Sequence, residues 1–235
     1  MILTKQIALA ALHQCQAISG DKGLALPEVI TSEYTSASGA VVVDHDLKII
    51  FVVFKGSKEF KDFVYDAKFH KDTICFVEDK PVRIHCGFSE QELSIKDRVS
   101  DVLFDTFVEN TEYEVIITGH SLGGSIAEIY AARECDDRTS LITFGKACTG
   151  NKVFYDFLEE NPHHNFRLYN EKDQIPKWLD GKFKYTHGGI PVELKDVRSE
   201  VEPANPLAAI FNHDTVKDYE IAIKALPDNL NERII

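Results

Sequence analysis

One serine occupies a segment suited to a sharp turn between a strand and a helix. Ser121 follows the β-branched run Val115–Thr118 and precedes an apolar helical pattern, with Gly119 and Gly123 two positions on either side. The pattern Gly-x-Ser-x-Gly in this setting lifts a serine hydroxyl clear of a sheet, where it can attack a carbonyl carbon. Ser121 is therefore a candidate nucleophile for acyl transfer. The alternative is a Gly/Ser turn without chemistry.

A serine nucleophile needs a base to take its proton and a carboxylate to orient that base. Where a serine is presented on such a turn, the acid and then the histidine follow it in the chain. The loop after the strand predicted at 165–169 offers Asp173 as the acid, with Glu171 as a nearby competitor. Two histidines follow: His213 stands in a loop directly before the last predicted helix, whereas His187 belongs to a short predicted strand. We favour Asp173 as the acid and His213 as the base.

The tetrahedral intermediate of acyl transfer also needs N–H donors for its oxyanion, and losing one typically costs about 10² to 10³ in rate. The N–H of Leu122, at the amino end of the helix after the serine, is the first candidate. The second comes from the turn after the apolar run Ile49–Phe54, where Gly56 turns the chain and Ser57 presents its N–H or its hydroxyl.

Hydrophobic periodicity indicates the elements that hold these residues. From Tyr113 onward, predicted strands alternate with predicted helices. The strands are at 113–118, 140–144 and 165–169, and the helices are at 122–134 and 151–160. Such alternation is typical of an α/β fold with a mostly parallel central sheet and helices on both faces. A hairpin is predicted from Ala40–Val43 and Ile49–Phe54, the second strand being apolar throughout and therefore covered on both faces.

Further elements are predicted before the hairpin, between the hairpin and the strand at 113–118, and after the strand at 165–169. The first helix places five residues on one face, namely Leu3, Ile7, Ala11, Cys15 and Ile18. Short strands are predicted at 74–77 and 82–85, and a last helix at 214–226. A long helix from Ser89 to Asn110 is predicted to direct these residues at the core: Leu93, Val99, Val102, Leu103 and Phe107.

Composition limits the class of protein. The 235 residues, 44% of them hydrophobic, suit a single domain spanning 1–235. The net charge of −12 argues against nucleic acid as a partner, and no apolar run approaches the length needed for stable membrane insertion. The five cysteines are odd in number without metal-ligand spacing, and the apolar run at 7–12 is short for a signal peptide. These features predict a cytoplasmic protein with reduced thiols and no metal.

Several motifs in order make the chain resemble the class 3 lipases, a family of α/β-hydrolases that includes the fungal triacylglycerol lipases. The resemblance extends from about Val41 to Tyr219. Its motifs are VVFKGS (52–57), DFVYD (62–66), HCGF (85–88), GHSLGG (119–124), FGKACTGN (144–151), NEKDQIP (170–176), YTHGG (185–189) and the final histidine. The chain departs from the family pattern beside the candidate triad, at Lys55 for arginine, Phe63 for tryptophan and Ala147-Cys148 for Pro-Arg.

The resemblance implies an α/β-hydrolase fold with a short lid helix, and hydrolysis of carboxylic esters of lipids without a metal or organic cofactor. It implies Ser121 as nucleophile, Asp173 as acid and His213 as base. Ser57 and Leu122 become the oxyanion-hole residues, and His187 the non-catalytic histidine. The expected partner is a small-molecule ester or lipid substrate, and the negative net charge favours neutral esters such as acylglycerols.

Residues 58–71 place Phe60, Phe63, Val64 and Ala67 on one face of a charged helical pattern. In the family the lid lies in this region, so we expect an amphipathic lid that makes transient contact with a lipid interface. The alternative is an ordinary surface helix. Two other functions are compatible with the same residues: a catalytically silent lipase-like binding or signalling protein, and a thioesterase that uses the same triad.

Overall fold

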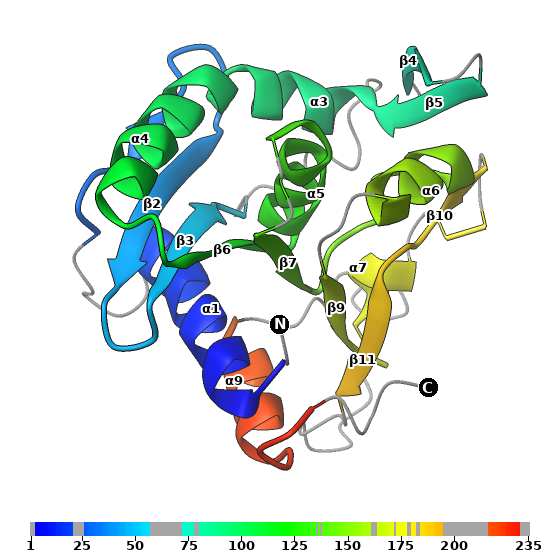
Figure 1. Cartoon of the computed structure of the whole chain (residues 1–235). Helices are drawn as coiled ribbons and strands as arrows, with labels where there is room; N and C mark the ends of the chain where they lie inside the picture. The colour runs from blue at the N-terminus through cyan, green and yellow to red at the C-terminus, as the bar shows by residue number, and fades with distance from the viewer. Residues whose placement is uncertain are drawn as a thin grey trace.

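The structure of the chain, a computed structural model, describes residues 3–20, 26–56, 72–77, 80–134, 136, 138–160, 164–171, 173–177, 180–181, 184–194 and 216–230. Within these residues the chain forms two β-sheets, and helices lie on both faces of the larger one (Figure 1). The helices are α1 Lys5–Ile18, α3 Cys86–Leu93, α4 Lys96–Glu109, α5 Leu122–Glu134, α6 Lys152–Glu160, α7 Gln174–Lys177 and α9 Val216–Lys224.

The larger sheet has the strand order β1-β2-β3-β6-β7-β9-β11 among the described residues. Its strands are β1 Ile30–Thr31, β2 Ser38–Asp44, β3 Ile49–Phe54, β6 Glu114–His120, β7 Thr139–Phe144, β9 Asn165–Asn170 and β11 Ile190–Leu194. From β3 to β11 neighbouring strands run parallel, whereas β1, β2 and β3 pair antiparallel. The predicted α/β class, the parallel sheet and the hairpin are therefore confirmed.

The smaller sheet has the strand order β10-β8-β5-β4 and is antiparallel throughout. Its strands are β4 Asp72–Val77, β5 Lys80–His85, β8 Gly150–Asn151 and β10 Tyr185–Thr186. The two longer strands confirm the predictions at 74–77 and 82–85. Helix α6 packs against β5 and β8, so this sheet adjoins the main body through the segment that follows β7.

The core has two halves because the side chains of a strand alternate between the faces of a sheet. The even-numbered residues of β3 pack with residues of α4 and α5. Its odd-numbered residues pack with residues of α1 and α9 on the other face, where Figure 1 shows these two helices together. Every residue of β3 is buried, which confirms the prediction of a strand covered on both faces.

The helix predicted from Ser89 to Asn110 is instead two helices, α3 and α4. Ser94 ends α3 with its hydroxyl bonded to the carbonyl of Gln91 at 2.7 Å, and Ile95 adopts a non-helical conformation with its side chain buried. This break leaves Leu93 52% exposed, so its predicted place in the core is wrong. Val99 and the three later residues of the prediction do pack on the core. Apolar spacing did not reveal the break because the residue at the break is itself apolar and buried.

Strands β1, β8 and β11 were not predicted from the sequence, whereas β10 lies in the short strand predicted before Gly188-Gly189 and ends at Thr186. Strands β1 and β8 have two residues each, too few to show an alternating pattern. Strand β11 contains Pro191, which an edge strand tolerates because one side of its backbone needs no donor. It pairs with β9 and so lies beside the strand that leads to Asp173.

Candidate active site

Ser121 lies at the junction of β6 and α5, as the sequence predicts. Its φ is +58°, a left-handed backbone conformation that is unusual for a residue other than glycine. The Ser121 N–H donates to the carbonyl of Phe144 at 2.9 Å, and the Ser121 carbonyl accepts from the N–H of Gly124 at 3.0 Å. Its Oγ is buried and has no hydrogen-bond partner among the described residues. Strain together with an unsatisfied buried hydroxyl is typical of a functional position.

The two glycines of the turn are required by close backbone contacts. A Cβ at Gly119 would lie 2.2 Å from the carbonyl oxygen of Gly123, and a Cβ at Gly123 would lie 2.2 Å from the carbonyl oxygen of Phe54. Both distances are far below van der Waals contact, and backbone atoms are the obstacle in both cases. The amino end of α5 can therefore approach the end of β3 only because these positions carry no side chain.

The turn after β3 also lies against the serine turn. A Cβ at Gly56 would lie 2.8 Å from the carbonyl oxygen of His120 and 3.6 Å from Cβ of Ser121. Leu122 is the first residue of α5, so its N–H is among those that a helix leaves without an intrahelical acceptor. The second predicted oxyanion-hole residue, Ser57, lies outside the described residues, directly after Gly56.

Asp173 is fully buried and directly precedes the short helix α7, whereas its competitor Glu171 is exposed. The Ile175 N–H donates to Asp173 Oδ1 at 3.0 Å, and the hydroxyl of Tyr219 on α9 donates to Asp173 Oδ2 at 3.0 Å. This arrangement fixes the orientation of the carboxyl group from two sides. The contact of Tyr219 with Asp173 was not predicted from the sequence.

The peptide unit between Phe144 and Gly145, at the end of β7, contacts both Ser121 and Asp173. The carbonyl of Phe144 accepts the Ser121 N–H, and the next residue, Gly145, has a φ of +54°. A Cβ at Gly145 would lie 2.9 Å from Asp173 Oδ2 and 2.6 Å from the hydroxyl of Tyr219. Ser121 and Asp173 therefore border the same two-residue segment, at the carboxyl end of the parallel strands where open α/β sheets bind ligands.

The remaining predicted site residues lie outside the described residues. These are the base His213, the oxyanion-hole residue Ser57 and the lid residues Phe60, Phe63 and Val64. The competing histidine, His187, directly follows β10 and contacts other groups through both ring nitrogens: Nε2 bonds to the carbonyl of Pro176, and Nδ1 lies 3.3 Å from Nζ of Lys146. Burial first, and then the charges of Lys146 and Arg167, lower the pKa of His187 to about 2.

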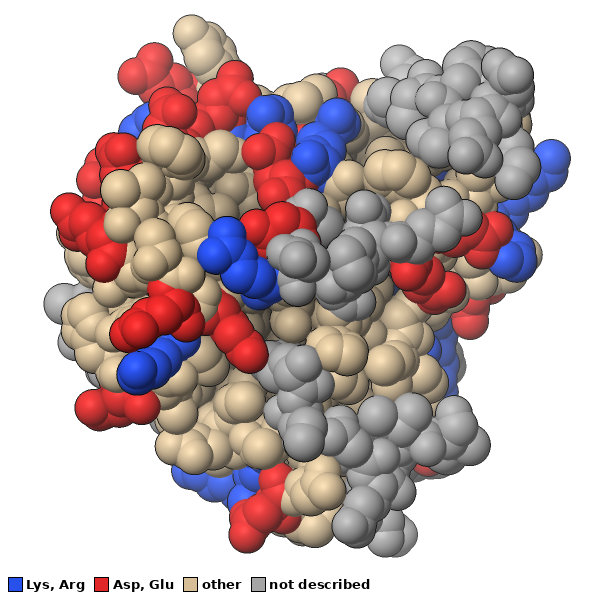
Figure 2. Space-filling view, in the orientation of Figure 1, with Lys and Arg blue, Asp and Glu red and all other residues tan. Residues whose placement is uncertain are grey.

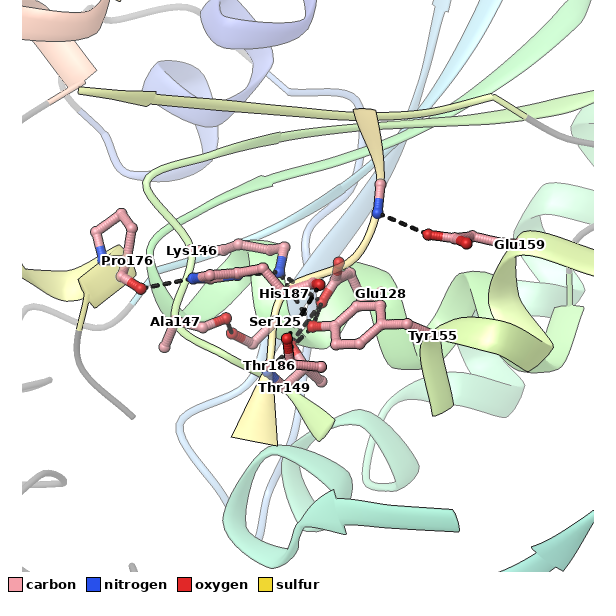
Figure 3. A network of polar contacts seen from close by, with 11 residues as sticks. Ser125, Glu128, Lys146, Ala147, Thr149, Tyr155, Glu159, Pro176, Thr186 and His187 are labelled. Carbon is pink, nitrogen blue, oxygen red and sulfur yellow. Dashed lines mark hydrogen bonds and ion pairs between the residues drawn. The ribbon is translucent and has the colours of Figure 1, made fainter. Parts of the chain in front are cut away.

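A buried polar network beside the serine turn was missed from the sequence (Figure 3). Lys146 and Glu128 form an ion pair at 3.0 Å with both side chains fully buried. Thr149 and Tyr155 donate hydroxyl hydrogen bonds to the same Glu128 oxygen, at 2.6 and 2.9 Å. The available signal was Glu128 itself, a single charge within the apolar pattern of the helix, because a buried charge needs a partner.

A pocket of about 420 Å³ lies beside the acid loop, lined in part by Asp173, Lys177, Asp180 and His187. Among the described residues there is no group of three or more His, Cys, Asp or Glu side chains placed to hold a metal ion. Across the same part of the chain, no helix is both long and apolar enough to cross a membrane.

The family model described as "Lipase (class 3)" matches residues 51–181, a span that contains Ser121 and Asp173. The chain is 27% identical over 182 residues to the lipase of Rhizopus niveus, covering 73% of this chain and 45% of that protein. It is 23% identical over 206 residues to the secreted mono- and diacylglycerol lipase 1 of Fusarium solani, covering 84% of this chain and 61% of that protein. The chain therefore spans about half the length of the relatives it matches.

Solved lipase structures share the fold. The lipase from Rhizopus microsporus var. chinensis superposes with a TM-score of 0.68 at 22% identity, covering 91% of this chain and 82% of that one. A triacylglycerol lipase from Penicillium expansum gives a TM-score of 0.69 at 23% identity, covering 83% and 82%. The expected α/β-hydrolase fold is thereby confirmed.

The prediction of a cytoplasmic protein is contradicted by these relatives, since those from Fusarium solani and Penicillium cyclopium are named secreted lipases. The prediction rested on the short apolar run at 7–12, the lack of an apolar stretch long enough to span a membrane and the odd cysteine count, and none of these indicates the compartment. Cys15 and Cys148 are free and buried, and burial raises the pKa of each thiol to about 12. Such thiols are unreactive in an oxidising compartment as well as in a reducing one.

Proposed function

The chain belongs to the class 3 lipase family, and we propose that it is a serine hydrolase that cleaves carboxylic ester bonds of lipids such as acylglycerols. One observation carries the proposal: the strained Ser121, whose buried hydroxyl has no partner among the described residues, stands at the amino end of α5 against the turn at Gly56. A serine that served only as a turn residue would have no physical reason for this combination.

In the proposed reaction, His213 takes the hydroxyl proton of Ser121 while Oγ attacks the ester carbonyl carbon. The resulting oxyanion accepts hydrogen bonds from the N–H groups of Leu122 and Ser57. The C–O bond to the alcohol then breaks, and His213 returns the proton to the departing alcohol. A water molecule, deprotonated by His213, next attacks the acyl-enzyme, releasing the carboxylic acid and restoring Ser121. Asp173 orients His213 and stabilises its charged form throughout.

The charge of the surface supports neutral esters as substrates. Four exposed acidic residues repeat every fourth position along α4, namely Asp97, Asp101, Asp105 and Glu109. Figure 2 shows acidic side chains gathered over the side of the molecule that carries this helix. Together with the net charge of −12, this surface repels anionic phospholipid headgroups. Acylglycerols carry no charge, so they approach without this penalty.

The test is hydrolysis of a p-nitrophenyl ester series, from short to long acyl chains, by the wild type beside Ser121→Ala. We expect activity in the wild type only, and covalent labelling of the wild type alone by a fluorophosphonate probe, read as an intact-mass increase. A matched acyl thioester is assayed in parallel. Preference for the thioester would identify a thioesterase. A folded wild type that neither turns over nor is labelled would overturn the proposal and favour the binding protein.

A further inference from the structure

A continuous series of polar contacts through the buried Lys146 connects α5, the helix after Ser121, with α7, the helix after Asp173. Lys146 Nζ lies 3.0 Å from Glu128 Oε2, 3.2 Å from the Tyr155 hydroxyl and 3.3 Å from His187 Nδ1. An ammonium group has three donors, and here each of the three has an acceptor. Full burial of this charge is therefore compatible with its hydrogen-bonding needs.

The contacts of His187 define its tautomer. The Pro176 carbonyl can only accept a hydrogen bond, so His187 Nε2 carries the proton and donates it to that carbonyl. Nδ1 is then unprotonated and accepts from the Lys146 ammonium. Figure 3 shows the imidazole between these two partners. The lowered pKa of His187 keeps the ring neutral, which is the form that these two hydrogen bonds require.

The partners at the two ends of this connection belong to the elements that carry the candidate nucleophile and acid. Glu128 is on α5, the helix that starts directly after Ser121. Pro176 is in α7, the helix that starts directly after Asp173. With only four residues, α7 has too few internal hydrogen bonds to be stable alone. Its position must therefore be set by contacts with the rest of the protein, and the bond from His187 to Pro176 is one of them.

We propose that His187 is a positioning residue, which holds the α7 turn, and with it the Asp173 carboxylate, at a fixed place relative to the helix of Ser121. Lys146 anchors the imidazole to Glu128, and the imidazole anchors the Pro176 carbonyl. The catalytic part of this inference rests on the proposed role of Asp173 as the acid. A polar network that contributed only to stability would give no reason for one of its bonds to end on the carbonyl of the acid-bearing turn.

Two substitutions separate the two bonds of the imidazole. His187→Gln places an amide nitrogen near the position of Nε2, so it keeps a donor for Pro176. His187→Asn places an amide oxygen near the position of Nδ1, so it keeps the acceptor for Lys146 but does not reach Pro176. On a water-soluble short-chain ester we expect His187→Asn to lower kcat by about 10- to 100-fold with KM nearly unchanged, because misplacement of a catalytic group by about 1 Å has an effect of this size.

His187→Gln keeps the donor for Pro176 but loses the acceptor for Lys146, so we expect its kcat to fall less than that of His187→Asn. A second readout is the acidic limb of the pH profile of kcat/KM, which reports the base His213. A displaced Asp173 stabilises the charged imidazole less, so in His187→Asn this limb moves to lower pH, and in His187→Gln it moves less. The control is the same substitution to asparagine at the exposed His45, which contacts Tyr113, and it should change neither readout.

Hydrogen exchange tests the positioning without relying on activity. The Ile175 N–H donates to Asp173 Oδ1, so its exchange reports whether the turn is held. We expect faster exchange in His187→Asn and a smaller increase in His187→Gln, even if the protein hydrolyses no ester, in which case only the proposed function fails. Unchanged exchange at Ile175 in His187→Asn would overturn the positioning proposal. Equal losses of kcat in both variants of an active enzyme, with unshifted pH profiles, would overturn it as well and leave the proposed function standing.

Discussion

The hydroxyl of Tyr219 lies 3.0 Å from Asp173 Oδ2 and 3.4 Å from the backbone nitrogen of Asn170. One phenolic oxygen on α9 thus contacts both the end of β9 and the carboxylate that follows it. The Asn170 N–H donates to this oxygen, and the oxygen in turn donates to the carboxylate. The proposed base His213 lies three residues before α9 in the sequence, so this contact is made by the helix that follows the base.

Tyr219→Phe removes this hydroxyl and keeps the buried ring. The fully buried Asp173 carboxylate then loses a donor, so we expect the free energy of unfolding to fall by about 1–3 kcal/mol. We also expect kcat on a soluble ester to fall by about 10-fold, because the acid is less well oriented. Chemical denaturation and steady-state kinetics measure the two effects.

The control for Tyr219→Phe is Tyr113→Phe, since the Tyr113 hydroxyl contacts His45 in an exposed position. This substitution should change the free energy of unfolding by less than about 0.5 kcal/mol and leave kcat unchanged. If the two variants behave alike, the bond between Tyr219 and Asp173 does not orient the acid.

The strained backbone of Ser121 predicts that glycine at this position stabilises the protein relative to alanine. A residue with a Cβ is strained at a φ of +58°, and glycine is not. The strain costs alanine about 1–2 kcal/mol, and the greater backbone entropy that glycine loses on folding offsets about 0.5–1 kcal/mol of this. We therefore expect Ser121→Gly to have a free energy of unfolding about 0.5–1 kcal/mol above that of Ser121→Ala. Both variants lack the hydroxyl, so the comparison isolates the backbone.

The same pair of substitutions at Ser125, inside α5, should give the opposite order. Ser125 is buried within regular helix, where glycine is less stable than alanine by about 1 kcal/mol. Urea denaturation of the four variants measures the difference in free energy of unfolding between glycine and alanine at each serine. This difference should have opposite signs at Ser121 and Ser125, which are four residues apart. An order that is the same at both positions would contradict the strain at Ser121.

The sequence was most informative where local rules determine the geometry. The turn at Ser121 followed from the spacing of two glycines between a strand and a helix, and Asp173 from its place in a loop after a buried strand. Tyr219 could not be found in this way because it lies 46 residues from its partner, and a tyrosine in an amphipathic helix is indistinguishable from a core residue. Its role depends on where α9 packs, which periodicity does not specify.

The Lys146 network shows a second limit of the sequence. Glu128 interrupts an apolar helix pattern, which indicates a buried charge that needs a partner. The sequence does not say which of the 26 basic residues that partner is. The pairing with Lys146 follows from the parallel neighbours β6 and β7, which bring the start of α5 beside the end of β7. The helix break at Ile95 was missed for the same reason: burial of that residue depends on tertiary packing, which the local sequence does not specify.

Two buried groups should give opposite dependences of stability on pH between about 4.5 and 6.5. Burial and the nearby cations lower the pKa of His187 to about 2 from 6.5, so the unfolded chain takes up a proton that the folded chain does not, and stability falls as the pH falls. Burial raises the pKa of Glu92 from 4.5 to about 7, although the charge of Arg133 acts in the opposite direction. The folded chain therefore holds a proton that the unfolded chain releases. The stability that this proton contributes is complete below pH 4.5 and is lost as the pH rises through 7.

Single substitutions should separate these two contributions. His187→Gln removes the acid-induced loss, so its free energy of unfolding should fall less steeply than that of the wild type as the pH is lowered from 6.5 to 4.5. Glu92→Gln removes the stability that Glu92 contributes as the pH is lowered, so the free energy of unfolding of this variant should fall more steeply than that of the wild type. Each difference in slope approaches about 1.4 kcal/mol per pH unit at most. Urea denaturation at several pH values measures the slopes, and three parallel curves would contradict both assignments.

The buried ion pair of Lys146 and Glu128 should show strong thermodynamic coupling. Lys146→Met leaves the Glu128 carboxylate buried with only the hydroxyl donors of Thr149 and Tyr155, and we expect a loss of about 3–5 kcal/mol. In Lys146→Met/Glu128→Leu no charge remains uncompensated. The double variant should therefore be more stable than the sum of the single losses predicts, with a coupling energy of about 1–3 kcal/mol.

The matched control is the exposed ion pair of Lys152 and Asp156, which are four residues apart on α6. Its coupling energy should be about 0.3–0.5 kcal/mol, since solvent screens both charges. Two double-mutant cycles measured by chemical denaturation make the comparison. Equal coupling in the two cycles would mean that the interior pair is solvated in solution. In that case Lys146 would not hold His187 rigidly, and the proposed positioning of the α7 turn would lose its anchor.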